Sequence, residues 1–298
     1  MGRIRDALVI GARTVARVPI PSAITTHALR EARMALPPGG VQKRHAVDVE
    51  MVGRTRCVWL DRHHADQGVI VHLHGGAYTS GPFAADWNWL SHQVDKHGCA
   101  GVMVDYRTAP DHVHPVAIDD AHAVVEALAE RGDLKAPWVL SGHHAGGGLA
   151  MVLARRLADQ MSIAQPAALI VVCPWLDLEL SNSGLSETGQ HDPVHERRIM
   201  REAARAYAGR TPLDDPELSP INGSLEGLPP IHLSVGTRDL FLSDVRVAKL
   251  QLEENEAELK YRELNGRLGL RLWARRGEDM QRLVSEHADL IRRAFRGN

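Results

Sequence analysis

The chain has 298 residues, of which 44% are hydrophobic and 24% charged, and this composition excludes the collagen-like, intrinsically disordered and disulfide-scaffold classes. Lys and Arg total 35 against 37 for Asp and Glu, so the formal net charge of -2 gives no broad attraction to nucleic acid or to an anionic membrane. The length allows two domains or one large α/β unit with insertions.

The N-terminal segment imitates the start of a signal peptide, but Arg13 and Arg17 interrupt its apolar run, so we interpret it as an amphipathic helix. No apolar run approaches the roughly 20 residues that a membrane-spanning helix needs. The three cysteines, Cys57, Cys99 and Cys173, include no C-x-x-C pair, so neither a disulfide framework nor a zinc ribbon is encoded. We therefore expect a cytoplasmic protein with no membrane partner.

From residue 49 to residue 148, short β-branched runs alternate with helical stretches, a pattern typical of a mostly parallel sheet with helices on both faces. The first two strands are expected to form an antiparallel pair. The predicted strands cover residues 49–52, 56–60, 69–73, 101–105, 138–141, 168–173, 231–235 and 259–263. The predicted helices cover residues 117–130, 145–158, 197–207, 243–254 and 280–295.

Two segments fall outside the sheet pattern. They are residues 1–45 and residues 181–215, and the second contains a helical stretch between joints rich in Gly, Ser and Pro. We expect the two segments to form the two parts of a helical cap. The core would then comprise residues 46–180 and 216–298. No internal repeat with a fixed period is present, which excludes a solenoid.

Two glycine-rich turns follow predicted strands and have the form of catalytic loops. The run HGGAY at residues 74–78 contains paired glycines, which leave backbone N–H groups able to bind an anionic oxygen. The run GHHAGGG at residues 142–148 consists largely of small residues that allow a sharp strand-to-helix turn with its central side chain presented outward. The two turns predict an oxyanion-hole loop and a nucleophile elbow.

With these turns, the chain resembles the bacterial hormone-sensitive lipase family of α/β-hydrolases, in which a His-Gly-Gly loop precedes a Gly-Asp-Ser-Ala-Gly-Gly elbow. Further motifs follow the family order: VDYRTAPDH at 104–112, PVAIDDA at 115–121, PWLDL at 174–178, DPV at 192–194, LSP at 218–220, GTRD at 236–239 and LSD at 242–244. The resemblance covers most of residues 45–295 and implies an α/β-hydrolase fold with about eight strands and a helical lid. Because the family often dimerises, it also implies a homodimer as a candidate assembly.

The chain departs from the family at the catalytic positions. The family uses a Ser nucleophile at the centre of the elbow, where this chain has His144, and an Asp before it, where this chain has His143. The family acid is retained as Asp239, but Gly269 stands where the catalytic His would lie. The resemblance thus implies a degenerate triad. Since a serine hydrolase needs both the hydroxyl and the base, we do not expect conventional esterase or lipase activity.

An imidazole is much longer than a hydroxymethyl group, so we expect His144 to fill the space of the missing histidine and to bond to Asp239. This pair would leave the other ring nitrogen near the backbone N–H groups of an oxyanion hole formed by Gly75, Gly76 and Ala145. A base beside such donors suits proton abstraction next to a carbonyl group. We therefore predict a cofactor-independent acid–base enzyme, of cyclase, lyase or isomerase type, acting on a small carbonyl-containing substrate.

Two alternatives remain open: a non-catalytic pseudo-esterase that binds or senses a small ligand, and residual ester hydrolysis that uses His144. Under all three readings, the residues that we expect around the substrate pocket beneath the cap are His74, Tyr78, His143 and Trp87. The many histidines suggest a metal ligand set, but the loop already accounts for His74, and we predict no metal. No Walker A or other cofactor motif is present, so we predict no cofactor.

Overall fold

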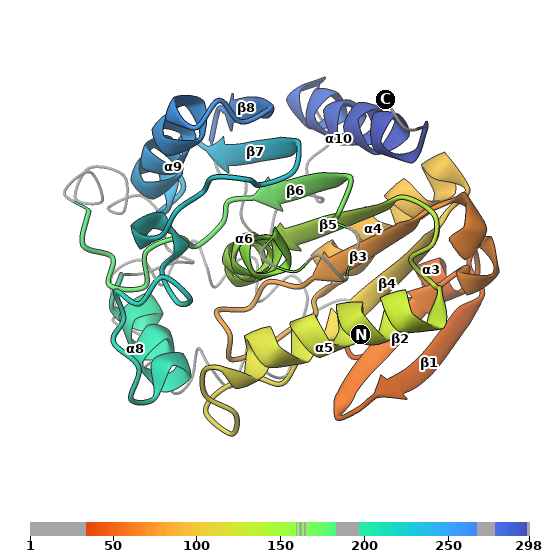
Figure 1. Cartoon of the computed structure of the whole chain (residues 1–298), viewed down its shortest axis with the longest axis horizontal. Helices are drawn as coiled ribbons and strands as arrows, with labels where there is room; N and C mark the ends of the chain where they lie inside the picture. Colours follow the sequence, from red (N-terminus) through yellow and green to blue (C-terminus); the bar gives the residue numbers. More distant parts are fainter. Residues whose placement is uncertain are drawn as a thin grey trace, which may run out of the picture.

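A computed structural model of the chain describes residues 34–158, 160, 163, 165–182, 197–266 and 278–296. At its centre is an eight-stranded sheet with the strand order β1-β2-β4-β3-β5-β6-β7-β8 (Figure 1). Strands β1 and β2 form an antiparallel hairpin, and β2 is also antiparallel to β4. The other neighbouring strands are parallel, so the predicted mostly parallel sheet and its antiparallel first pair are confirmed.

The strands lie close to their predicted positions. The five strands from β3 to β7 are buried along their whole length, which explains their nearly continuous apolar sequences. The strand bounds are β1 (Val47–Val52), β2 (Thr55–Leu60), β3 (Val69–Leu73), β4 (Ala100–Asp105), β5 (Trp138–His143), β6 (Ala168–Val172), β7 (Ile231–Gly236) and β8 (Leu259–Leu264).

The helices include the five that the sequence predicts and two that it does not, α3 and α4. In the unpredicted α4, polar residues such as Asp86 and Gln93 share the buried face with the apolar ones. The helix begins where Asp86 accepts a hydrogen bond from the Phe83 N–H group and ends at Gly98, whose φ is 59°. The bounds are α3 (Gly39–Gln42), α4 (Ala84–His97), α5 (Val116–Arg131), α6 (Ala145–Ala158), α8 (Arg197–Ala208), α9 (Leu242–Glu254) and α10 (Glu278–Arg296). Two short 3-10 helices are η1 (Arg62–Gln67) and η3 (Pro220–Asn222).

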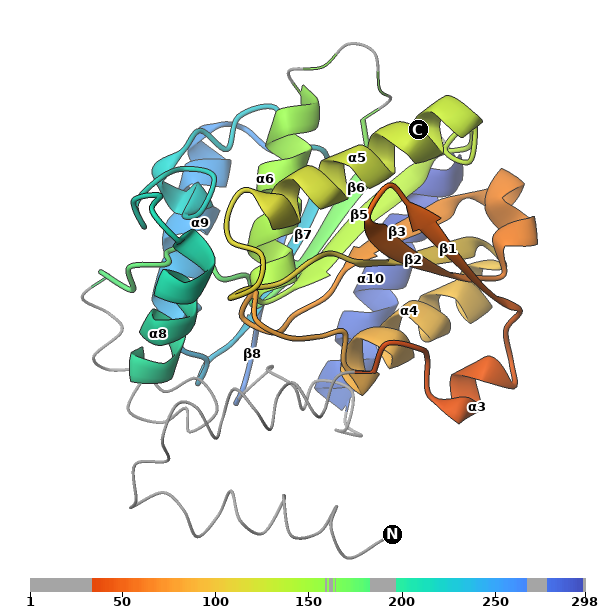
Figure 2. The same cartoon turned by 90° about the horizontal axis from the view of Figure 1, so that it is seen from below.

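Helices cover both faces of the sheet (Figure 2). On one face, α5, α6 and α9 contribute to the larger of two hydrophobic clusters, which includes Leu149 and Val245. On the other face, α4 and α10 enclose a smaller cluster that contains Trp87, Trp89 and Ile291. The two apolar faces explain why the central strands carry hydrophobic side chains at consecutive positions rather than at alternate ones.

The predicted cap lies partly outside the described residues, which do not include 1–33 and 183–196. Within the first cap segment, residues 34–45 pack on the core: Val41 belongs to the smaller hydrophobic cluster, and the Met34 N–H group donates to the Pro82 carbonyl oxygen at 2.7 Å. In the second segment, α8 lies beyond the carboxyl ends of the parallel strands (Figure 1). No helix within the described ranges is long and apolar enough to span a membrane.

Candidate functional site

The elbow predicted at residues 142–148 is a sharp turn between β5 and α6. His144 stands between the last residue of the strand and the first residue of the helix, with the left-handed φ of 49°. The turn needs a glycine at 146, because a Cβ atom there would lie 2.2 Å from the Leu73 carbonyl oxygen. The backbone therefore has the predicted elbow form and holds the His144 side chain at its apex.

The imidazole of His144 lies between the glycine loop and the acid. Its Nδ1 atom is 3.6 Å from the position that a Cβ on Gly75 would take, and its ring meets Phe241 edge-on, with 6.0 Å between ring centroids. The side chain is nearly buried, with 9% of the residue exposed. The His144 N–H group donates to the Val172 carbonyl oxygen at 3.0 Å, which fixes the elbow to β6.

Asp239 reaches the same place from the turn after β7. Its backbone N–H group donates to the Gly236 carbonyl oxygen at 3.0 Å, and the residue is fully buried. One ring nitrogen of His144 and one carboxylate oxygen of Asp239 lie within 4.8 Å of each other. The structure thus brings the two predicted catalytic residues together. Gly269, the position of the missing family histidine, lies outside the described residues.

Cys173 is a third member of this group that the sequence analysis missed. Its sulfur lies within 4.8 Å of the same nitrogen of His144 and the same oxygen of Asp239. The residue is fully buried, directly after β6, and has a left-handed φ of 47°. The cysteine spacing predicts neither a disulfide nor a zinc ribbon, and the one signal for Cys173 in the sequence is its position at a strand end, immediately before the PWLDL motif.

The oxyanion-hole loop requires one correction. The Gly75 N–H group donates to Oδ1 of Asp86 at 3.3 Å, so it is directed toward α4 and is not a donor to the expected oxyanion. Gly76 has a φ of 126°, and a Cβ atom there would lie 2.1 Å from the Ser80 carbonyl oxygen. Ala145 is the first residue of α6, where helix N–H groups have no partner within the helix. Gly76 and Ala145 therefore remain as the predicted donors.

His74 does not line a pocket as predicted. Its ring is fully buried and stacks on Tyr106, with 4.1 Å between ring centroids and 6° between ring planes. Its Nδ1 atom lies 2.8 Å from the Gly75 carbonyl oxygen, and the Tyr106 hydroxyl donates to the His74 carbonyl oxygen at 2.7 Å. These contacts hold the glycine loop in its shape from its buried side.

His143 also lies away from its predicted place, because its ring is directed toward α4. Its Nδ1 atom is 3.0 Å from Oδ1 of Asp86, and Nε2 of His72 is 3.4 Å from the same oxygen. Burial raises the pKa of Asp86, but hydrogen bonds from His143 and His72 outweigh burial and hold the pKa well below its usual range. Burial lowers the pKa of His72 to about 4. An ionised carboxylate thus organises a buried polar group beneath the elbow.

Of the two aromatic residues predicted to line the pocket, Trp87 lies in the hydrophobic core and Tyr78 lies against α8. Trp87 is fully buried in the smaller hydrophobic cluster, and its indole N–H donates to the Met34 carbonyl oxygen at 2.7 Å, so its predicted place in the pocket is wrong. Tyr78 lies on the opposite side, where its ring stacks on Tyr207 of α8 with 3.9 Å between ring centroids. Tyr78 therefore links the glycine loop to α8, which lies in the second of the two segments predicted to form a cap.

Two groups of side chains could hold a metal ion among the described residues. The first is His72, Asp86 and His143; the second is His144, Cys173 and Asp239; in each, the ligand-type atoms lie within 4.8 Å of one another. In the first group, the hydrogen bonds to Asp86 account for the arrangement. The second group offers nitrogen, sulfur and oxygen donors, a set that zinc accepts. The absence of a metal remains a prediction.

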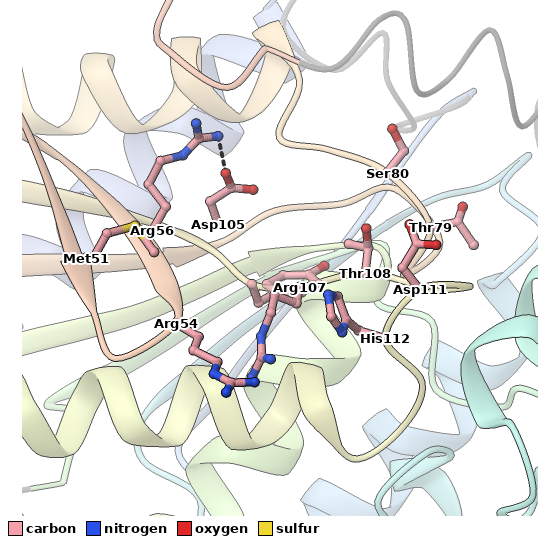
Figure 3. Close-up of a pocket in the computed structure, with 11 residues that line it drawn as sticks. Met51, Arg54, Arg56, Thr79, Ser80, Asp105, Arg107, Thr108, Asp111 and His112 are labelled. Carbon is pink, nitrogen blue, oxygen red and sulfur yellow. Dashed lines mark hydrogen bonds and ion pairs between the residues drawn. The ribbon is translucent and has the colours of Figure 1, made fainter.

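A cavity of about 580 Å³ lies between the β1–β2 hairpin and the loop after β4, and Thr79 and Ser80, which follow the glycine loop, also line it (Figure 3). Its lining includes Arg56, Arg107 and His112 but none of the residues predicted to surround the substrate. Asp105 forms an ion pair with Arg56, and Asp120 forms one with Arg107, so two of the arginine charges in the cavity wall are balanced. This cavity is therefore distinct from the pocket that the sequence predicts beneath the cap.

Comparison with known families and proteins places these features among hydrolases. A family model described as alpha/beta hydrolase fold matches residues 70–268. An acetyl-hydrolase of Streptomyces hygroscopicus is 30% identical over 213 residues, which are 72% of this chain and 68% of that protein. A putative acetyl-hydrolase of Mycobacterium tuberculosis is 32% identical over 205 residues, which are 68% of this chain and 66% of that protein.

Solved structures agree with the chain over almost its whole length. A crystal of EstE5 soaked with p-nitrophenyl butyrate gives a TM-score of 0.82 at 21% identity, covering 97% of this chain and 98% of that one. A hormone-sensitive lipase from a metagenome library gives 0.79 at 23% identity, with the same coverage of 97% and 98%. At such identities the likeness shows the fold alone, and that fold is the one the sequence predicts.

Proposed function

Because the chain belongs to the α/β-hydrolase family, we propose that it uses the strand ends of that fold for acid–base catalysis, with His144 as the base and Asp239 as its partner. The observation that carries this proposal is the position of the His144 ring, which lies between the Asp239 carboxylate and the glycine loop. The substrate is a small molecule with a carbonyl group.

Asp239 supports the base by its charge and its position. A carboxylate beside an imidazole fixes the ring orientation and stabilises the imidazolium that forms when the base takes a proton. Burial of Asp239 excludes water from this pair, which strengthens the interaction. His144 has a left-handed φ, which a non-glycine residue keeps only when the surrounding structure enforces it. The same surroundings therefore fix the direction of its ring.

Gly76 and Ala145 supply the second half of the chemistry. The amide of Ala145 opens α6, where the helix dipole favours negative charge. Gly76 holds a backbone conformation that other residues rarely adopt, next to the elbow. In the proposed reaction, these two N–H groups bind the carbonyl oxygen of the substrate and stabilise the negative charge that develops on it.

The proton transfer is balanced within the site. His144 removes a proton from the carbon next to the carbonyl group; the C–H electron pair forms a C=C bond, and the carbonyl oxygen becomes an enolate oxygen. The imidazolium then gives a proton back to the same carbon after exchanging its own with solvent, gives it to another carbon, or gives it to a leaving group as the bond from carbon to that group breaks. These outcomes correspond to exchange, isomerisation and elimination, and each uses the same two side chains.

The relatives support the class of functional group. The acetyl-hydrolases of Streptomyces hygroscopicus and Mycobacterium tuberculosis have names that refer to acetyl groups, which contain a carbonyl with exchangeable neighbouring protons. Since the matched region covers about two thirds of each relative, transfer of their substrate class to this chain is part of the proposal. Neither name supports cyclase or lyase chemistry over hydrolysis.

The test is solvent deuterium exchange into small ketones and acetyl esters, followed by proton NMR, with release of p-nitrophenol from p-nitrophenyl butyrate measured in parallel. We expect the wild-type protein to accelerate exchange or release over a buffer blank. His144→Ala and Asp239→Asn should each reduce the rate by roughly a hundredfold or more, because each removes part of one catalytic unit.

The matched control is His112→Ala, which removes a histidine from the wall of the other cavity. Its rates should equal those of the wild-type protein. Rates at the blank level for the wild-type protein, together with saturable ligand binding that survives Asp239→Asn, would overturn the proposal in favour of a non-catalytic binding protein.

A further inference from the structure

The pairing of β5 with β6 places His144 and Cys173 next to each other at adjacent strand ends. Strands β5 and β6 are parallel and hydrogen-bonded, and their last paired residues are His143 and Val172. The next residue on each strand is therefore His144 on one side and Cys173 on the other. Both have left-handed backbone conformations, with φ values of 49° and 47°. Adjacent strained residues at strand ends are typical of functional sites.

Hydrogen bonds hold these two residues in place. The His144 N–H group donates to the Val172 carbonyl oxygen at 3.0 Å, and the Cys173 N–H group donates to the Ser234 carbonyl oxygen at 2.7 Å. Three strand ends, those of β5, β6 and β7, are thus joined just before the turn that carries Asp239. The thiol, the imidazole and the carboxylate come from these three ends, with their functional atoms within 4.8 Å of one another.

We infer that Cys173 is the nucleophile of this site, with His144 as its base and Asp239 as the partner that orients the base. This inference rests on the proposed role of His144 as the base and goes beyond proton abstraction from carbon: the reaction is acyl transfer from a small ester. A thiol, a base and a carboxylate within 4.8 Å of one another are the groups that activate a cysteine nucleophile. The elbow contributes the base, and the adjacent strand contributes the nucleophile.

The covalent step is balanced. His144 takes the proton from the Cys173 sulfur, and the thiolate electron pair forms an S–C bond to the ester carbonyl carbon. The carbonyl oxygen carries the negative charge, which the Gly76 and Ala145 N–H groups stabilise. When the C=O bond reforms, the C–O bond to the leaving group breaks, and the alcohol departs with the proton from His144.

Water completes the reaction. His144 takes a proton from a water molecule, whose oxygen attacks the thioester carbonyl carbon. The S–C bond then breaks, the sulfur recovers a proton from His144, and the carboxylic acid leaves. No oxidant, reductant or cofactor enters the balance, and the nearly complete burial of the three side chains requires a small acyl group.

The other two cysteines provide internal controls. Cys57 on β2 and Cys99 before β4 are also fully buried, and burial raises the pKa of each thiol to about 12. No histidine–aspartate pair accompanies either of them within the described residues. All three thiols are therefore equally buried, and Cys173 differs from the other two because His144 and Asp239 lie beside it.

The experiment is a time course of alkylation of the native full chain by iodoacetamide, with each cysteine measured by peptide mass spectrometry. We expect Cys173 to react on the order of a hundredfold faster than Cys57 and Cys99, because a histidine and an aspartate lie within 4.8 Å of its sulfur. His144→Ala should slow Cys173 to the rate of the other two, whereas His112→Ala should leave the rate unchanged. A Cys173 rate equal to those of Cys57 and Cys99 in the wild-type protein overturns the inference.

Turnover separates this inference from the proposed function. Cys173→Ala, with its fold checked by circular dichroism, should abolish ester hydrolysis, and an acyl adduct on Cys173 should be detected in wild-type protein quenched with acid. If Cys173→Ala keeps full activity while His144→Ala loses it, the base is supported and the nucleophile assignment is overturned. If Cys173 reacts rapidly and His144→Ala has no effect, the proposed base itself fails.

Discussion

The Nδ1 atom of His143 lies 3.0 Å from Oδ1 of Asp86, and this contact joins the elbow to α4. Asp86 also accepts hydrogen bonds from the N–H group of Gly75 at 3.3 Å and from that of Phe83 at 2.9 Å. One carboxylate thus holds the glycine loop, the elbow and the first turn of α4. The positions of the candidate catalytic groups depend on a residue that does not itself reach the site.

Asp86→Ala should lower the free energy of unfolding by about 3 kcal/mol, because it leaves the buried N–H groups of Gly75 and Phe83 without their acceptor. Asn88→Ala changes an exposed residue on the same helix and should alter stability by less than about 0.5 kcal/mol. Urea unfolding followed by circular dichroism measures both. Equal midpoints for the two variants would show that Asp86 has no organising role.

Gly146→Ala should destabilise the protein by about 3 kcal/mol or more, because the added Cβ would lie 2.2 Å from the Leu73 carbonyl oxygen and 2.4 Å from that of His74. Gly40→Ala is the matched control, since a Cβ at Gly40 in α3 meets nothing within 4 Å. The control should be neutral or stabilising by up to about 1 kcal/mol. Thermal unfolding of the two variants measures the difference in stability between them. Equal unfolding temperatures would show that the turn relaxes to accommodate the added Cβ.

Asp244 should make the protein less stable as the pH rises from about 4 to about 7. Burial, followed by repulsion from Asp177, raises the pKa of Asp244 from 3.8 to about 7. The folded protein therefore holds this proton more tightly than the unfolded chain, and the resulting stabilisation, present below the unfolded pKa, is lost as the pH rises through the folded pKa.

The check is the difference in unfolding free energy between Asp244→Asn and the wild-type protein at several pH values. This difference should rise between pH 4 and pH 7 by on the order of 3 kcal/mol, because the amide does not titrate. Asp119→Asn, whose side chain is 56% exposed in the wild-type protein, should show no such rise. A constant difference for Asp244→Asn would contradict the raised pKa.

Buried histidines should destabilise the protein in acid. Burial lowers the pKa of His72 and of His232 from 6.5 to about 4 in each case. Below the unfolded pKa, the unfolded chain takes up protons that the folded protein refuses, so stability is complete above about pH 6.5 and falls toward pH 4. Each histidine should cost about 2 kcal/mol at pH 5.

His232→Gln isolates one of these contributions, since the amide can still donate to Glu286 but does not titrate. Its unfolding free energy, relative to the wild-type protein, should improve by about 2 kcal/mol between pH 7 and pH 5. His112→Gln, at a half-buried position in the cavity wall, is the control for replacing an imidazole by an amide. A parallel pH profile for His232→Gln and the wild-type protein would refute the lowered pKa.

The sequence predicts the sheet well because the buried parallel strands have unbroken apolar runs, such as Val69 to Val71, that few other structures explain. It does not predict α4, although Trp87, Leu90 and Val94 have helical spacing. Polar residues such as Asp86 and Gln93 share the buried face of this helix and obscure the pattern. That helix carries Asp86, so the direction of His143 and the engagement of the Gly75 amide could not be anticipated. Three of the four corrections at the site, those for Gly75, His143 and Trp87, therefore follow from one missed helix.

The elbow and the glycine loop are predictable because each consists of consecutive residues with a demanding backbone. The partnership of His144 with Asp239 is predictable from the family layout, and the structure brings the two together. Cys173 belongs to the same group only through the pairing of β5 with β6. Strand register joins residues that are far apart in the chain, and a single sequence does not give it.

The left-handed conformations of His144 and Cys173 also bear on the stability of the fold. A side chain in this conformation costs roughly 1 kcal/mol that glycine would not incur. Glycine at either position would relieve this strain but would also remove a buried imidazole or a buried thiol and leave a cavity. The packing of these two side chains therefore offsets the cost of their backbone conformation.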